Sequence, residues 1–423
     1  MRLLKPILSL LLLFGFTALL DAPHGGRSAF YLLSLCALAK LALRPQPIAI
    51  SLTAFIRQYW PLHVAMIWTM LAIFVSDLHH AQWSFKSYEA AFQLALFPLI
   101  SWVLLSLTFE RLRISEWGFV LAAIVSPVLM YVATNGGAVR NDLVVGTKLI
   151  PFTNLSLLLG ILALMSLRNN KKEEWIAIAI KLLAGACALY TSYLSQTRGG
   201  WLALPIFIIL GVAAIKRLRI ANKIILIAAL FLALGTVAKY SSVVSQRILA
   251  VQNDIASYEA DNDRDTSLGV RLQLWRGSWI LFTEHPIFGI GLQNFPQSLD
   301  ELQQRGLVTP FTAKGFTHSH NDVLFNMLTL GIGGLAAILA MFFVPAAYFI
   351  RDLRHADDRI KSNAYMGLSL IAGLFIFGLS DTIFFWGISH TFYSLGLAIL
   401  FAQSVRCHLE EKKKGDAPIV QQR

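Results

Sequence analysis

Twelve apolar runs, each close to the length that crosses a lipid bilayer, constrain this chain more than any other feature. An α-helix needs about 20 mostly apolar residues to span the hydrocarbon core. The pattern therefore predicts an all-α polytopic membrane protein with about 12 transmembrane helices. The runs cover approximately residues 6–21, 27–43, 62–77, 88–107, 116–133, 149–167, 175–194, 201–215, 222–239, 321–350, 364–384 and 388–405.

The composition excludes the other large classes of protein. Hydrophobic residues make up 56% of the 423-residue chain and charged residues 14%, and the mean hydropathy is +0.61. Soluble globular proteins carry about 25% charged residues, so this chain lacks the charge to cover a soluble surface. A cytosolic enzyme, a disordered protein and a disulfide-rich secreted domain are thereby excluded. The first apolar run has no small-residue cleavage site before Asp21-Ala22-Pro23, so we expect an uncleaved helix.

Positive charges are distributed unequally between the connections. If the N-terminus lies in the cytoplasm, the cytoplasmic segments contain 21 Lys and Arg residues, whereas the short connections on the other side contain 5. Cytoplasmic loops of membrane proteins carry such an excess. The distribution predicts that both termini are cytoplasmic, and it explains the net charge of +12 without nucleic acid as a partner.

One polar connection, residues 240–320, is much longer than the others and is predicted to lie on the outer side between spans nine and ten. Within it we expect a helix over 268–284 that ends at His285-Pro286, because the residue before proline avoids the α region. The outer connections contain no cysteine, so the loop is expected to fold by packing on a single membrane domain, residues 1–423. An apolar stripe on the helix predicts that it lies at the membrane interface. The stripe consists of Leu268, Leu272, Trp275, Trp279 and Phe282.

Arginines on the predicted outer side are candidates for anion binding. The turn Ser195-Gln196-Thr197-Arg198-Gly199-Gly200 combines glycines, which turn tightly, with an arginine, whose fork of donors suits phosphate. The alternative is an arginine that merely extends to the membrane surface. Arg271 and Arg276 lie at the two edges of the apolar stripe, where they can contact a lipid-linked phosphate or bulk lipid. Arg140 and Lys148, in another outer connection, can assist an anionic ligand.

A histidine-rich segment, Thr317-His318-Ser319-His320-Asn321-Asp322, precedes the tenth apolar run. Asn321 is a good N-cap, which would place His320 at the positive end of a helix dipole and favour a neutral, proton-accepting imidazole. A structural histidine pair is the alternative, and a metal site is disfavoured because no carboxylate or cysteine cluster accompanies the histidines. Downstream, Gly331 and Gly334 fit a close helix–helix contact.

Three of these patterns together resemble the O-antigen ligase family, within the wider O-antigen ligase/polymerase superfamily. Residues 195–200 resemble its Ser-x-[Ser/Thr]-Arg-Gly turn, and Gly269 to Trp275 resemble its Gly-x-Arg-x-x-x-Trp helix. His320-Asn321, nine residues and then Gly331-Ile332-Gly333-Gly334 fit His-[Asn/Ser/Gln]-x9-Gly-x-x-Gly, which selects His320 over His318. Leu335 stands where the family often has threonine.

The resemblance implies a GT-C-type fold with a large periplasmic loop between helices 9 and 10, and a metal-independent, inverting glycosyltransferase without a cofactor. Such an enzyme transfers O-antigen polysaccharide from undecaprenyl diphosphate to lipid A–core oligosaccharide at the periplasmic face of the bacterial inner membrane, in lipopolysaccharide biosynthesis. The resemblance and the charge pattern imply that His320 is the catalytic base and that Arg198 and Arg271 bind and stabilise the diphosphate. Further substrate-binding residues are expected to be Arg276, Arg140, His318 and Asn321.

Other functions fit the same patterns. An O-antigen polymerase and a protein O-oligosaccharyltransferase share the motifs and differ in the acceptor. A transporter for a lipid-linked glycan is the alternative of a different class. A transporter is expected to place ionisable residues at the membrane midplane. The candidate charges here cluster at the outer interface, which favours an enzyme.

Overall fold

The computed structural model describes residues 4–21, 25–42, 50–139, 141–168, 175–197, 199–216, 218–240, 242–260 and 263–415. Within these ranges the chain is almost wholly helical. The described part contains one sheet, in which β1 (Leu143–Val144) pairs antiparallel with β2 (Thr147–Lys148). The expected all-α fold is therefore confirmed.

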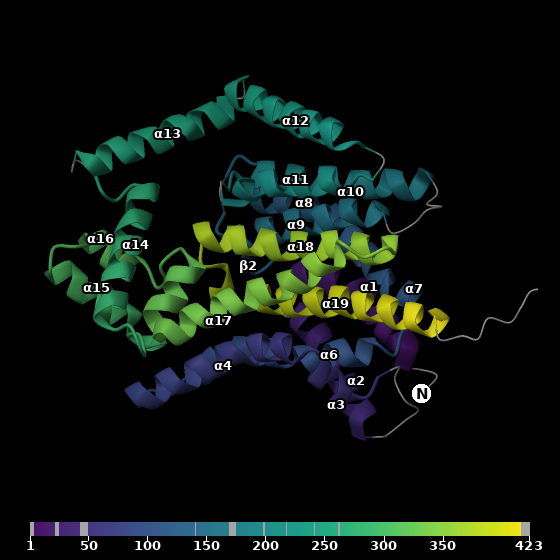
Figure 1. Cartoon of the computed structure of the whole chain (residues 1–423). Coiled ribbons are helices and arrows are strands. Elements are labelled where there is room, and N and C mark those ends of the chain that lie inside the picture. The colour runs from purple at the N-terminus through teal and green to yellow at the C-terminus, as the bar shows by residue number, and fades with distance from the viewer. Residues whose placement is uncertain are drawn as a thin grey trace, which may run out of the picture.

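Each of the twelve predicted runs coincides with helical structure, and most of these helices lie side by side in one elongated bundle (Figure 1). The run at 88–107 is broken into two helices at Leu96, where Pro98 in the new first turn lacks a backbone donor. The helices are α1 (Leu4–Asp21), α2 (Gly25–Ala42), α3 (Leu52–Gln58), α4 (Trp60–His80), α5 (Phe85–Ala95), α6 (Phe97–Leu104), α7 (Phe109–Leu112), α8 (Ile114–Thr134), α9 (Leu149–Met165), α10 (Trp175–Ser195), α11 (Leu204–Ala214), α12 (Ile220–Tyr240), α17 (Asp322–Asp352), α18 (Asp358–Ser380) and α19 (Gly387–Gly415), with 3-10 turns η1 (Ser166–Arg168), η2 (Gly199–Ala203) and η4 (Ile383–Phe385).

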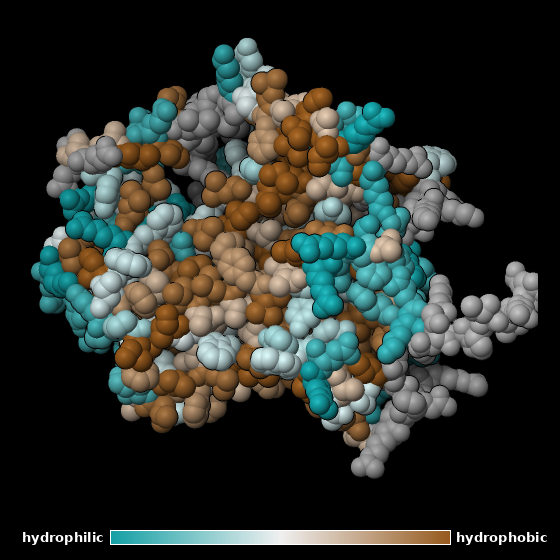
Figure 2. All heavy atoms as spheres, viewed as in Figure 1, coloured by the Kyte–Doolittle hydropathy of each residue, from teal (hydrophilic) through white to brown (hydrophobic). Residues whose placement is uncertain are grey.

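Length and composition make the bundle a multi-pass membrane protein. Figure 2 shows a broad apolar band across the middle of the molecule, with hydrophilic side chains gathered at its two ends. Shorter apolar helices cover Lys5–Leu20, Leu149–Met165, Gly199–Ala214 and Ile220–Thr236. Among the described residues, seven helices are long and apolar enough to cross a membrane: Trp60–His80, Phe85–Leu104, Phe109–Thr134, Trp175–Ser195, Asp322–Asp352, Asp358–Ser380 and Gly387–Lys412.

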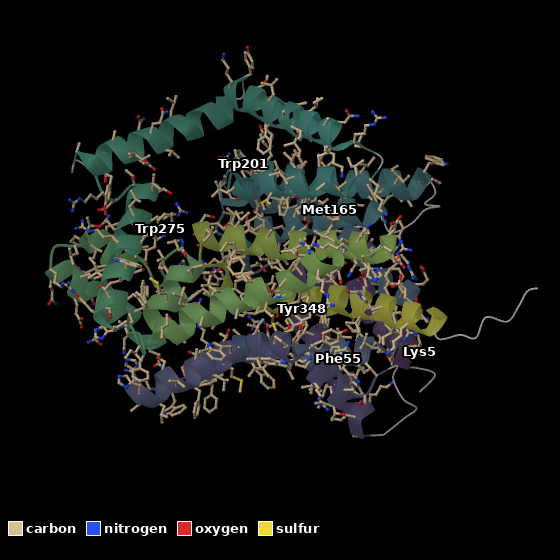
Figure 3. All side chains as sticks on the ribbon, viewed as in Figure 1. Lys5, Phe55, Met165, Trp201, Trp275 and Tyr348 are labelled. Atoms are coloured by element: carbon tan, nitrogen blue, oxygen red, sulfur yellow. The ribbon has the colours of Figure 1, made fainter. Side chains whose placement is uncertain are left out.

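Residues between α12 and α17 form a layer, which we call the loop layer, at one end of the bundle (Figure 1). We call this end of the bundle the loop end. Trp275 lies in this layer and Trp201 toward the same end, whereas Lys5 lies at the opposite end (Figure 3). The layer has an apolar core of its own, in which Leu274 and Leu299 pack with Phe325 and Leu328 of α17. The layer thus packs against the first part of α17, while its periplasmic position stays a prediction. Its elements are α13 (Ser242–Glu259), α14 (Ser267–Glu284), η3 (Leu292–Asn294), α15 (Phe295–Gln304) and α16 (Pro310–Gly315).

Helix α14 ends at Glu284 with His285 as its C-cap, as the sequence predicts. It buries a face that differs from the predicted stripe. Val270, Leu274 and Leu281 are buried, whereas Trp279 of the stripe is 57% exposed. The other stripe residues are partly buried, and Phe282 packs against the same apolar core as Leu274. Contact of the helix with the membrane interface therefore stays a prediction.

Gly331 has a different role from the predicted helix–helix contact. It breaks α17 with φ 64° and ψ −151°, a backbone conformation open almost only to glycine. At this break Ile332 N donates to Pro286 O at 2.8 Å, and Gly291 N donates to Thr329 O at 3.0 Å. A Cβ atom at position 331 would lie 2.2 Å from Ile287 O. The glycine therefore lets the loop dock on the broken helix.

Gly331→Ala should destabilise the protein markedly, because it adds about 1–3 kcal/mol of backbone strain and a clash that displaces the loop. Gly333→Ala is the matched control, since its Cβ would meet only Ala72 Cβ at 3.8 Å. Apparent melting temperatures in detergent measure the difference. Equal melting temperatures for the two variants would contradict this account of the break.

Candidate active site

The structure places His320 beside an aspartate that lies 61 residues away in the chain. His320 Nδ1 is 2.8 Å from Asp381 Oδ1, and the two side chains are 17% and 5% exposed. Asp381 directly follows α18, and His320 directly precedes the N-cap of α17. We call His318, His320 and Asp381 the His–Asp cluster.

The start of α17 is fastened to the end of α18, which holds the cluster together. Asn321 Oδ1 caps the helix by accepting from Leu324 N at 3.0 Å, as the sequence predicts. Asn321 N donates to Thr382 Oγ1 at 3.0 Å, and Asn321 Nδ2 donates to Leu379 O at 3.0 Å. His320 itself has φ 52°, a value uncommon for a residue other than glycine. Asn321 is therefore placed to hold the backbone beneath His320.

Charge determines which nitrogen of His320 can take a proton. Burial would raise the pKa of Asp381, but the hydrogen bond from His320 and the positive charge of that ring hold this pKa below its ordinary value. An ionised carboxylate only accepts hydrogen bonds, so Nδ1 of His320 carries the proton in this contact. In the neutral ring Nε2 is then the unprotonated nitrogen, able to act as a base.

His318 lies against His320 but in a drier setting. Their ring centroids are 4.4 Å apart, and Phe385 packs 5.0 Å from the His318 ring. Burial, and then the neighbouring His320, lowers the pKa of His318 to about 4. His318 is therefore neutral at physiological pH and suits packing or hydrogen bonding rather than ion pairing.

Because the pKa of His318 is low, the free energy of unfolding depends on pH. The unfolded chain protonates this histidine below about pH 6.5, and the folded protein only below about pH 4. Between these values the unfolded state binds more protons, so the free energy of unfolding falls as the pH is lowered, by up to about 2 kcal/mol at pH 5. The apparent melting temperature of the wild type should therefore drop more between pH 7 and pH 5 than that of His318→Gln. An equal drop would contradict the buried neutral ring.

Arg271 reaches the same place from α14. Its Nε donates to Ser380 O at 3.3 Å, so it binds the residue next to Asp381. Its Nη1 also donates to Ser267 O and Ser267 Oγ, both at 3.0 Å. The guanidinium is thus held beside the His–Asp cluster, as a cation that can face an anionic group.

The turn that leads into η2 also approaches Ser380, whose carbonyl oxygen accepts from Arg271. A Cβ at Gly199 would lie 2.7 Å from Ser380 Oγ, so this glycine permits the close approach of the turn to the end of α18. Ser195 Oγ and Thr197 Oγ1 are 3.0 Å apart within the turn. Arg198 itself lies outside the described residues, and its placement at the diphosphate stays a prediction.

The remaining candidates differ in position. Arg276 follows Arg271 by five residues, which puts it about 140° around the helix, and it is exposed. The structure therefore does not bring Arg276 to the His–Asp cluster. Arg140 lies outside the described residues. Lys148 does approach, because its Nζ lies 5.7 Å from the ring centroid of Trp386, which in turn packs against His318.

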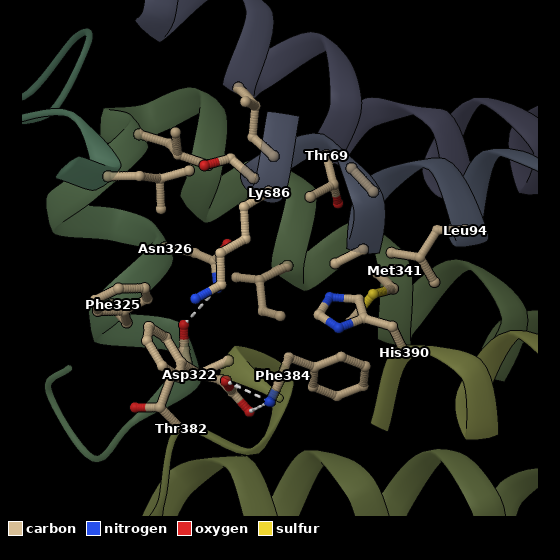
Figure 4. A pocket seen from close by; sticks show the side chains of 18 of the residues that line it. Thr69, Lys86, Leu94, Asp322, Phe325, Asn326, Met341, Thr382, Phe384 and His390 are labelled. Atoms are coloured by element: carbon tan, nitrogen blue, oxygen red, sulfur yellow. Dashed lines mark hydrogen bonds between the residues drawn. The ribbon is translucent and has the colours of Figure 1, made fainter. Parts of the chain in front are cut away.

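A cavity of about 280 Å³, shown in Figure 4, is lined by Thr382 and Phe385, which follow Asp381 in the chain. Phe385 lies between the cavity and the His–Asp cluster, since it lines the cavity and also packs on His318. Lys86 extends into the cavity, and Asp322 lines its wall while accepting from Phe384 N at 3.1 Å. The other walls are mostly apolar. Such a cavity suits a ligand that combines an apolar part with an anionic one.

Asp381 was not among the candidate residues, and it supplies the carboxylate whose absence was the argument against a metal site. The carboxylate comes from the end of α18, so His318, His320 and Asp381 place three possible ligand atoms within 4.8 Å of one another. An ionisable residue at the end of an apolar span was the available signal, because such residues are rare in membrane helices and usually functional. In this structure Nδ1 of His320 and Oδ1 of Asp381 satisfy each other by a direct hydrogen bond.

Fold and site together define a multi-pass helical membrane protein with a His–Asp pair and a cation at one end of the bundle. A protein-family model described as O-antigen ligase matches residues 183–339. The matched segment contains the turn at 195–200, Arg271, His318, His320 and Gly331, but it ends before Asp381. Over this segment the chain is similar to the O-antigen ligase/polymerase superfamily, as the motifs led us to expect.

A curated relative is similar to part of this chain, but it is itself uncharacterized. An uncharacterized protein of Haemophilus influenzae is 28% identical over 214 residues, which is 49% of this chain. The chain spans about half the length of that relative, 52%.

Proposed function

We propose that the chain is an inverting glycosyltransferase that moves O-antigen polysaccharide from undecaprenyl diphosphate to a hydroxyl of lipid A–core oligosaccharide. The observation that carries the proposal is the His320–Asp381 hydrogen bond of 2.8 Å beside the Arg271 guanidinium. A base next to a fixed cation is what transfer from a lipid diphosphate to an alcohol requires. The positive-inside distribution supports a periplasmic position for the loop end in the inner membrane.

The base acts on the acceptor. A sugar hydroxyl is a weak nucleophile, and a positioned base assists its attack on the anomeric carbon. Nε2 of His320 takes the hydroxyl proton as the new carbon–oxygen bond forms, while Asp381 orients the ring and stabilises the imidazolium. A single displacement of this kind inverts the anomeric centre.

The cations act on the donor. As the bond between the anomeric carbon and the phosphate oxygen breaks, its electron pair stays with undecaprenyl diphosphate. Arg271 and, by prediction, Arg198 stabilise this developing charge where water is scarce. Lys148 near Trp386 and Lys86 in the adjoining cavity add positive charge to the same region. The apolar cavity beside the cluster fits a lipid-linked substrate.

The acceptor decides between this enzyme and its relatives. Purified protein in detergent should be incubated with undecaprenyl-diphosphate-linked glycan and, separately, with lipid A–core, a lipid-linked repeat unit or a pilin-like protein. We expect glycosylated lipid A–core. Extension of the repeat unit would identify a polymerase, and modification of the protein would identify an oligosaccharyltransferase.

A lipid-linked glycan transporter is the alternative of a different class, and the structure contains one feature that bears on it. Lys181 and Glu116 form a buried ion pair, with 3.5 Å between Nζ and Oε2, inside the bundle. Glu116 lies in the first turn of α8 and also binds Arg113, so the pair lies near a helix end rather than at the middle of a span. Movement of glycan across proteoliposomes without any transfer would support the transporter.

We expect transfer to be independent of divalent metal ions. The imidazole and carboxylate of the His–Asp cluster are engaged with each other, and the mechanism needs their proton-transfer chemistry. Initial rates should be the same in excess EDTA and in buffer. Loss of activity with EDTA and recovery on adding a divalent cation would show that the cluster binds a metal instead.

A further inference from the structure

A second cavity, which is polar and has a volume of about 290 Å³, lies at the end of the bundle opposite the His–Asp cluster (Figure 1). It is formed where α11 ends and where α12 and α18 begin. Its walls contain Lys216, Lys223 and Lys361 against one acidic residue, Asp358. The volume is enough for several water molecules, at about 30 Å³ each, or for a phosphate with part of its ester.

The three lysines of the cavity have different ion-pair and hydrogen-bond partners. Lys216 forms an ion pair with Asp358, which neutralises one positive charge. Lys223 Nζ donates to Ala213 O at 2.8 Å, one bond for a group with three donors. Tyr365 OH donates to the same carbonyl at 3.2 Å, so the C-terminal end of α11 is satisfied by protein donors. Lys361 is half-buried in the first turn of α18. The cavity therefore keeps an excess of positive charge.

A buried hydroxyl marks the cavity as a binding site. Ser362 lines it and is 3% exposed, yet its Oγ has no hydrogen-bond partner among the described residues. A buried polar group without a partner is costly, and a bound acceptor would satisfy it. Lys223 lies in the first turn of α12, so the N-terminus of this long helix adds to the attraction for an anion, whereas the N-terminus of α18 is already capped by Asp357.

The surroundings favour a lipid as the source of the anion. Helix α12 exposes apolar side chains beside the cavity, including Ile220 at 77% and Ile224 at 62%. Acyl chains can lie along this face while the headgroup enters the cavity. The positive-inside distribution assigns this end to the cytoplasm, and basic pockets on that side bind anionic headgroups.

We propose that this cavity binds the phosphate of an anionic phospholipid, such as phosphatidylglycerol, and so anchors α12 to α18. The proposal is independent of the transfer reaction, because the cavity and the His–Asp cluster lie at opposite ends of the bundle.

Native mass spectrometry of the full-length protein in neutral detergent tests this site. Phosphatidylglycerol should bind more tightly than phosphatidylethanolamine with the same acyl chains. Lys223→Gln and Lys361→Gln should each weaken phosphatidylglycerol binding about fivefold, because a lysine near an anionic lipid contributes about that factor. Ser362→Ala should weaken it as well. Lys412→Gln, an equal loss of charge at an exposed position of α19, is the matched control and should bind as the wild type does.

Three results would overturn the proposal. The first is equal affinity of the wild type for the two lipids. The second is equal affinity of the cavity variants and Lys412→Gln for phosphatidylglycerol. The third is binding of inorganic phosphate without binding of phosphatidylglycerol. The last result would assign the cavity to a soluble phosphate. Lys361→Arg keeps the charge and should keep lipid binding, which separates loss of charge from misfolding.

Discussion

His320→Ala should lower the initial rate of glycan transfer by about 10²–10⁴-fold, the range that a positioned general base contributes. Affinity for undecaprenyl-diphosphate-linked glycan should hardly change, because the proposed mechanism assigns the diphosphate to the arginines and not to the imidazole. Initial rates at saturating acceptor and donor binding by a tritiated or fluorescent analogue measure the two quantities separately. Retention of full activity by both His320→Ala and His318→Ala would remove the general base from the mechanism.

The neighbours of His320 provide the controls. His318→Ala should have the milder effect, because its ring is buried and neutral and lacks the bond to Asp381. An inactive His318→Ala beside an active His320→Ala would mean that the wrong histidine has been assigned as the base. In the proposed mechanism Asp381 is a positioning residue, so Asp381→Asn should lower the rate at saturating acceptor and leave donor affinity unchanged. Loss of donor affinity together with a lower melting temperature would instead indicate a merely structural role of Asp381.

Arg271→Ala should nearly abolish transfer, by about 10²–10³-fold, because it removes a fixed cation from the departing diphosphate. Arg198→Ala should have an effect of the same kind, since the turn at 195–200 packs on the same Ser380. Lysine at either position should restore only part of the activity, because it keeps the charge but loses the planar fork.

The control for the arginine variants is Arg305→Ala, in the same loop layer. Arg305 pairs with Glu284 on an exposed surface, a contact that adds little to stability. Expression and melting temperature of each variant show whether the protein remains folded, which matters because Arg271 also donates to Ser267. Full activity of both Arg198→Ala and Arg271→Ala would remove the diphosphate site from the mechanism.

Much of the architecture could be predicted from patterns that are local in the sequence. Apolar runs of span length predicted the helices of the bundle, because a membrane demands about 20 apolar residues wherever a helix crosses it. The N-cap at Asn321 and the end of α14 before Pro286 were predicted for equally local reasons, since capping and proline geometry involve residues only a few positions apart. The motifs likewise indicated His320 and Arg271 as candidates one by one.

Contacts between distant segments depended on the tertiary structure. Asp381 lies 61 residues from His320 and beyond the segment that matches the family, and no local pattern connects the two. Arg271 and Gly199 both lie next to Ser380, the residue before Asp381. These residues become neighbours only when α14, α18 and the turn at 195–200 pack together. Gly331 was misread for the same reason. Its spacing to Gly334 suggested a helix contact, whereas its positive φ and the docked loop appear only in the fold. The sequence alone thus determined the membrane helices and the chemical groups, whose signals are local, and the tertiary structure decided which of those groups meet.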